Sequence, residues 1–83
     1  MPTMKGRAGS AGAAGLNDAA RLYDEVAKEL DLAAQHCRTA SAHFRDREVP
    51  RGSAHAWAAY GHLIDAQERM RTQAREHAKR AVP

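Results

Sequence analysis

Apolar residues recur along two stretches of the chain with the alternating three-and-four spacing that places them on one side of a helix. In the first stretch this spacing selects Leu16, Ala19, Tyr23, Val26, Leu30, Ala33, Cys37, Ala40 and Phe44. In the second stretch it selects Ala56, Tyr60, Leu63, Gln67, Met70, Ala74, His77 and Ala81. The repeat predicts two long helices that pack along these two seams in the manner of a coiled coil.

The two stretches are separated by the segment Val49-Pro50-Arg51-Gly52-Ser53. Proline cannot continue a helix and disfavours helical geometry in the residue before it, and glycine allows the chain to reverse. We therefore predict an all-α fold, an antiparallel two-helix hairpin over residues 16–83. Its expected parts are a helix over 17–48, a turn over 49–52 and a helix over 53–81.

Folding the chain back at this turn brings the two predicted seams together in layers. The layers are Phe44 with Ala56, Ala40 with Tyr60, Cys37 with Leu63, Ala33 with Gln67, Leu30 with Met70, Val26 with Ala74, and Tyr23 with His77. Several layers match a large residue to a small one, as interdigitating side chains require. The position of the turn and the sizes of the paired residues thus predict the same register.

One flank of the predicted hairpin carries a further apolar stripe. Small residues of the first helix (Ala20, Ala27, Ala34 and Ser41) lie there beside Trp57 and Ile64 of the second. An exposed stripe of this kind usually marks an interface, and a hairpin in a chain of only 83 residues buries little surface by itself. We expect a homodimer that forms a four-helix bundle through Phe44, Trp57, Tyr60, Leu63 and Ile64. The alternative is a monomer in which Trp57 folds over Ala34 and Ser41.

The first fifteen residues differ from the rest in composition. They contain Gly6, Gly9, Gly12 and Gly15 among small alanines, which cannot bury enough apolar surface to offset backbone entropy. We expect a disordered tail over residues 1–15. This segment also lacks the apolar core of a secretory signal, and no apolar run in the chain is long enough for a membrane span. The expected setting is therefore cytoplasmic, with no membrane partner.

Charge is mixed, with 13 basic and 10 acidic residues and a net charge of +3. Acidic residues gather between positions 18 and 31 and basic ones between 69 and 80, and an antiparallel hairpin would place the two groups side by side. The basic group also suggests an alternative function, because cationic side chains can hold nucleic-acid phosphates. The candidate contacts are Arg69, Arg71, Arg75, Lys79 and Arg80, although no aromatic residues are interleaved with them for base stacking.

Five histidines raise the question of metal binding: His36, His43, His55, His62 and His77. His36 and His43 are seven residues apart on the first helix, and His55 and His62 are seven apart on the second. This spacing is about 10.5 Å, which is too far for one ion to bridge. A metal site would need pairs from both helices, such as His43 with His55 or His36 with His62, with Cys37 as a further candidate ligand. A histidine-rich metal-binding bundle is therefore a second alternative function, and the preferred interpretation includes no cofactor.

No arrangement of residues points to an enzyme. The chain has no nucleophile elbow and no glycine-rich phosphate loop. Its single cysteine, Cys37, excludes an internal disulfide and falls on the predicted seam, where a small buried hydrophobe is expected. The sequence therefore favours a small, non-enzymatic, self-associating hairpin that acts through protein–protein contacts as an adaptor, a regulatory subunit or a structural subunit.

Overall fold

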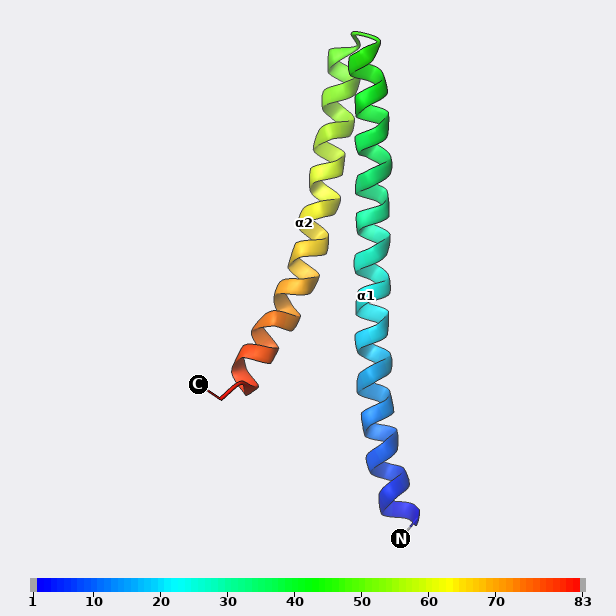
Figure 1. Cartoon of the computed structure of the whole chain (residues 1–83), viewed down its shortest axis with the longest axis vertical. Coiled ribbons are helices and arrows are strands. Elements are labelled where there is room, and N and C mark those ends of the chain that lie inside the picture. The colour runs from blue at the N-terminus through cyan, green and yellow to red at the C-terminus, as the bar shows by residue number, and fades with distance from the viewer. Residues whose placement is uncertain (1, 83) are drawn as a thin grey trace.

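The protein is a two-helix hairpin in its computed structural model, which describes residues 2–82 and gives side chains from residue 15 onward. Helix α1 spans Pro2–Arg45 and helix α2 spans Val49–Arg80. The helices pack against each other and run antiparallel from a tight turn (Figure 1). The predicted all-α hairpin is confirmed. The disordered tail expected over residues 1–15 stays a prediction, because the side chains of residues 1–14 lie outside what the structure describes.

Helix α1 ends in a pair of backbone hydrogen bonds typical of a Schellman motif. The amide of Glu48 donates to the carbonyl of His43 at 2.8 Å, and the amide of Arg47 donates to that of Phe44 at 3.0 Å. Arg47 has a φ of 62°, the left-handed conformation that usually favours glycine. Because these bonds satisfy the last carbonyls of the helix, α1 ends three residues before its predicted end at residue 48.

Helix α2 begins at Val49, so the turn occupies residues 46–48 and not the predicted 49–52. Pro50 lies in the first turn of α2, where the first amides of any helix have no partner and a missing proton costs little. Gly52 is buried within α2, and a Cβ built on it would lie 2.7 Å from the ring of Phe44. Gly52 therefore permits the close approach of an aromatic ring and takes no part in the reversal of the chain.

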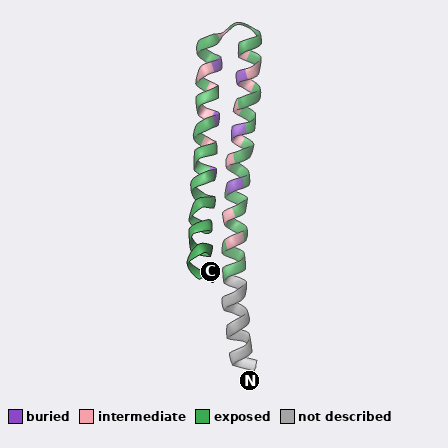
Figure 2. Ribbon diagram, turned by 60° about the vertical axis from the view of Figure 1, so that its left-hand side comes forward, coloured by how far each residue is buried: buried purple, intermediate pink, exposed green. Residues whose placement is uncertain are grey.

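The interior of the hairpin is lined by small residues. The buried residues recur every seven positions, as Val26, Ala33 and Ala40 on α1 and as Gly52, Ala59 and Ala66 on α2 (Figure 2). Side chains this small let two helix axes approach at the short end of the usual 8–10 Å range. Among the described residues, no polar or charged residue is fully buried.

The predicted seam of α2 is wrong. The predicted register places Tyr60 opposite Ala40 in the interior, but Tyr60 is 52% exposed. The buried Ala59 lies one position earlier, so α2 is turned by about 100° relative to the prediction. On α1 the seam is correct for Val26, Ala33 and Ala40, whereas the larger residues assigned to it are exposed: Leu16, Tyr23, Leu30 and Phe44.

The far end of α2 packs less closely than its beginning. Every described residue from Gln67 onward is exposed, and Figure 1 shows this end of α2 turning away from α1. Within residues 15–82, each arginine or lysine that forms an ion pair does so with a carboxylate three positions away. The expected pairing of the acidic segment of α1 with the basic segment of α2 is therefore not formed by ion pairs between the helices.

Candidate functional site

Four of the five histidines lie together between the helices. We call the buried residues that recur every seven positions on each helix its buried line. His36 and His43 each follow a residue of the buried line of α1 by three positions, and His55 and His62 each follow a residue of the buried line of α2 by three positions. The antiparallel arrangement brings these positions to the same flank of the hairpin. All four are partly buried, so they form one row of imidazoles along the seam.

The row is continuous from the turn to the middle of the hairpin. The rings of His43 and His55 stack with centroids 5.4 Å apart, and those of His36 and His62 stack at 5.5 Å. Between the two stacked pairs, the Nδ1 atoms of His36 and His55 lie 3.0 Å apart, at hydrogen-bond distance. One of these two rings donates its proton and the other accepts it.

A carboxylate lies at each end of the histidine row. The Nδ1 atom of His43 lies 2.9 Å from a carboxylate oxygen of Glu48 at the turn. At the other end, the Nδ1 atom of His62 lies 2.7 Å from a carboxylate oxygen of Glu29. The seam positions flanking the small residues are thus filled by polar groups that bond to one another, which compensates for their partial desolvation.

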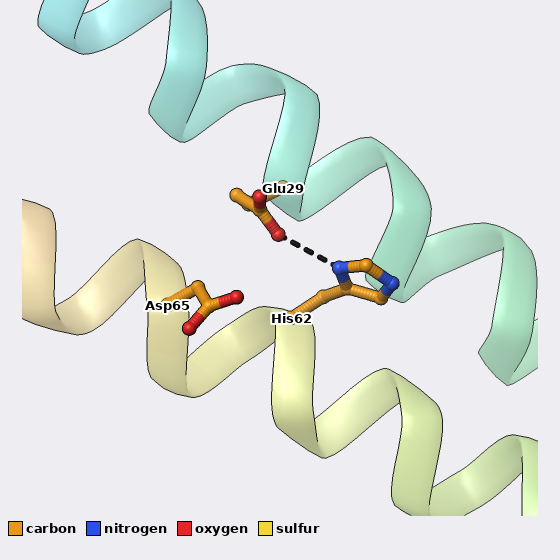
Figure 3. A group of neighbouring side chains, drawn as sticks. All are labelled: Glu29, His62 and Asp65. Carbon is orange, nitrogen blue, oxygen red and sulfur yellow. Dashed lines mark hydrogen bonds and ion pairs between the residues drawn. The ribbon is translucent and has the colours of Figure 1, made fainter.

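Asp65 joins Glu29 and His62 to form a group with metal-ligand chemistry. Glu29 comes from α1, and His62 and Asp65 come from one face of α2, three residues apart (Figure 3). One ligand atom from each residue lies within 4.8 Å of the other two. Glu29 is the least exposed, with 14% of its side chain accessible, compared with 29% for His62.

The structure brings together both cross-helix histidine pairs considered from the sequence, His43 with His55 and His36 with His62. Neither carboxylate, Glu29 nor Asp65, is among the site residues predicted from the sequence. Asp65 carries a readable signal, because a histidine and an aspartate three residues apart share one face of a helix. Glu29 carries none, because it meets His62 only through the hairpin.

The large apolar residues face away from the interior. Among the predicted interface residues, Trp57 is 71% exposed, and Phe44, Tyr60, Leu63 and Ile64 are also exposed. The rings of Trp57 and Tyr60 touch edge to face, with centroids 6.2 Å apart. These residues are accessible on the hairpin, and among them the ring of Phe44 also lies against Gly52 of α2.

Two surface hollows show which exposed residues of α1 lie beside which exposed residues of α2. One, of about 580 Å³, is lined by residues of both helices: Cys37, Ala40, Ser41, Phe44, Arg45 and Ala56. The other, of about 420 Å³, is lined by Tyr23, Met70, Gln73, Ala74, His77 and Arg80. Tyr23, Cys37 and Phe44 of α1 therefore lie on the same side of the hairpin as Ala56 and Met70 of α2. This side faces away from the histidine row. We call this side the apolar flank.

The candidate nucleic-acid contacts all lie on the exposed end of α2: Arg69, Arg71, Arg75, Lys79 and Arg80. Two of them are paired within the helix, Arg71 with Glu68 and Lys79 with Glu76. Cys37 is exposed and borders the apolar flank, so it is not the buried residue that the sequence predicted. No helix in the described part of the chain has an apolar stretch sufficient to cross a bilayer.

The fold and the two flanks define a helical hairpin with a polar, histidine-lined side and an apolar side. No protein-family model matches this chain, and comparisons with curated proteins and with solved structures found no match.

Proposed function

We propose that this protein is a non-enzymatic, self-associating helical hairpin that acts through protein–protein contacts. In this proposal a second copy of the chain covers the apolar flank and completes a four-helix bundle. One observation carries the proposal. The described hydrophobic residues that are buried are one valine and four alanines. Leu22 and Leu32 are half-buried, and most of the other large ones, such as Trp57, Phe44 and Leu63, are exposed.

The apolar surface of α1 has the angular width that a bundle requires. In a four-helix bundle each helix contacts two neighbours in directions about 90° apart, and the residues between them face the centre. Residues four positions after the buried line of α1 lie about 40° from it, and residues one position after lie about 100° from it. The first set is Tyr23, Leu30, Cys37 and Phe44, and the second is Ala20, Ala27, Ala34 and Ser41.

The apolar surface of α2 complements that of α1. Ala56, Leu63 and Met70 follow its buried line by four positions and would face the bundle centre, and Tyr60 lies about 100° from that line. Trp57 and Ile64 lie about 40° farther round. The small residues Ala20, Ala27, Ala34 and Ser41 of α1 leave the space that these bulky side chains need in a partner. Large residues of one copy would therefore pack against small residues of the other.

The exposed apolar surface is large enough to form an interface of standard size. Eight large side chains on this side are between 38% and 71% exposed: Tyr23, Leu30, Phe44, Trp57, Tyr60, Leu63, Ile64 and Met70. With about 200 Å² for a side chain of this size, they expose roughly 800 Å² per chain. This is the area that each partner buries in an interface of standard size, about 800 Å².

Cys37 provides a test on the unmodified protein. It is exposed in the hairpin and would face the centre of the bundle in the dimer. We expect light scattering to give twice the 9.1 kDa mass of one chain, and the reaction of Cys37 with a thiol reagent to slow as chain concentration rises. A mass of one chain at about 100 µM, with a thiol reactivity independent of concentration, would reject the proposal.

A matched pair of variants locates the interface. Tyr60→Glu places a charge where the partner would pack, and we expect it to weaken association about a hundredfold or more. Gln35→Glu introduces the same change in charge at an exposed position about 160° from the buried line of α1, and it should leave association unchanged. If Tyr60→Glu dimerises as well as Gln35→Glu, the second copy does not occupy the apolar flank.

A further inference from the structure

We infer that Glu29, His62 and Asp65 form a binding site for a divalent first-row transition-metal ion, such as Zn²⁺, that links α1 to α2. The site lies at one end of the histidine row, on the side of the hairpin away from the apolar flank. It therefore remains open to solvent whether or not a second copy binds, and the inference does not depend on the proposed dimer.

The geometry is close to that of a metal centre. Zinc binds imidazole nitrogen and carboxylate oxygen at about 2.0–2.2 Å, so two ligand atoms around one tetrahedral ion are about 3.4 Å apart. The three ligand atoms here lie within 4.8 Å of one another, and Figure 3 shows the side chains turned toward a common space between the helices. A displacement of about 1 Å in exposed or partly exposed side chains closes this difference.

The charges also favour a cation. Two carboxylates face a single imidazole, and within residues 15–82 neither Glu29 nor Asp65 forms an ion pair with a lysine or arginine. The Glu29 carboxylate has only 14% of its side-chain surface exposed, so water screens it weakly. A bound divalent ion would neutralise both carboxylates.

The donor set selects the class of metal. An imidazole nitrogen with two carboxylate oxygens suits zinc and its first-row neighbours, whereas calcium and magnesium prefer oxygen ligands alone. The ion would take the place of the hydrogen bond between His62 Nδ1 and Glu29, with the proton of the neutral ring on Nε2. Stacking of His36 at 5.5 Å holds the His62 ring in position.

Three protein ligands leave at least one coordination position to water, as in zinc sites that are open to further ligands. The ion would also join residues 33 positions apart in the sequence, Glu29 and His62. Binding should therefore stabilise the hairpin as a whole, because a site formed only when the helices are docked binds the folded state in preference to the unfolded one.

The test uses the untagged full-length chain after treatment with a chelator. We expect calorimetric titration with Zn²⁺ to show one ion per chain, and the melting temperature to rise when Zn²⁺ is added. Glu29→Gln and Asp65→Asn should each weaken binding about tenfold or more. Glu29→Gln should also lose the rise in melting temperature, since the remaining ligands both lie on α2.

Glu25→Gln is the matched control, because it changes an exposed carboxylate one turn earlier on α1 and should leave Zn²⁺ affinity within about twofold of the wild type. Circular dichroism of each variant without metal verifies that the hairpin is retained. Two results would overturn the inference. One is Zn²⁺ affinity that is unchanged in Glu29→Gln. The other is loss of binding in His55→Gln with Glu29→Gln unaffected, which would place the ion between His36 and His55.

Discussion

The contact between Gly52 and the ring of Phe44 allows the packing at the turn to be tested by a single methyl group. A Cβ on Gly52 would lie 2.7, 2.8 and 2.9 Å from three ring atoms of Phe44. Ordinary carbon contacts begin near 3.5 Å, so the ring must move by about 0.8 Å or change its rotamer. Gly61 provides the control, because it lies in the same helix and a Cβ there has no atom within 4 Å beyond its own helix backbone and adjacent residues.

The expected free energies differ in sign. Replacing a helical glycine by alanine without steric cost stabilises by about 0.5–1 kcal/mol, so Gly61→Ala should raise the free energy of unfolding by that amount. At Gly52 the same gain is opposed by overpacking, which typically costs about 1–3 kcal/mol. Phe44 is 45% exposed and can turn partly into solvent, which keeps the cost below the top of that range, at about 1.5–2 kcal/mol. Gly52→Ala should therefore lower the free energy of unfolding by about 1 kcal/mol.

A double-mutant cycle isolates the contact. With the ring removed by Phe44→Ala, the same Gly52→Ala change should become stabilising by about 0.5–1 kcal/mol, which gives a coupling of about 1.5–2 kcal/mol between the two positions. The measurement is urea unfolding followed by circular dichroism, with every variant at the same chain concentration. If Gly52→Ala stabilises the wild type as much as Gly61→Ala does, the ring of Phe44 does not pack on α2 and the description of the turn is incorrect.

Two further predictions test the termination of α1 and the row of buried residues. Arg47→Gly should raise the free energy of unfolding by about 0.5–1 kcal/mol, because glycine adopts the positive φ of 62° without the penalty of a Cβ; no gain in urea unfolding would argue against the left-handed turn. Ala66 is 1% exposed, so Ala66→Leu should destabilise the hairpin by about 1–3 kcal/mol, whereas the exposed Ala54→Leu should change stability by less than about 0.5 kcal/mol; similar values in thermal melts would mean that Ala66 does not face α1.

The helices and their antiparallel order could be predicted from the sequence. The three-and-four spacing of apolar residues persists through both helices, and Pro50 restricts where a second helix can begin. The exact turn could not be predicted, because Pro50 and Gly52 are acceptable both in a loop and in the first turn of a helix. Backbone bonds to Arg47 and Glu48 selected the earlier turn, and these bonds leave no signature in residue type.

The sequence also determined which residues were available for contact, but only the tertiary structure decided which contacts the hairpin uses. The apolar arc of each helix is wider than one seam, so its periodicity is compatible with rotations that differ by about 100°. The observed rotation turns the small Ala59 and Ala66 inward, which permits close approach of the axes, and leaves Tyr60 outside. The same rotation brings Glu29 to His62, a pairing that no local pattern specifies because the two residues meet only when the helices dock.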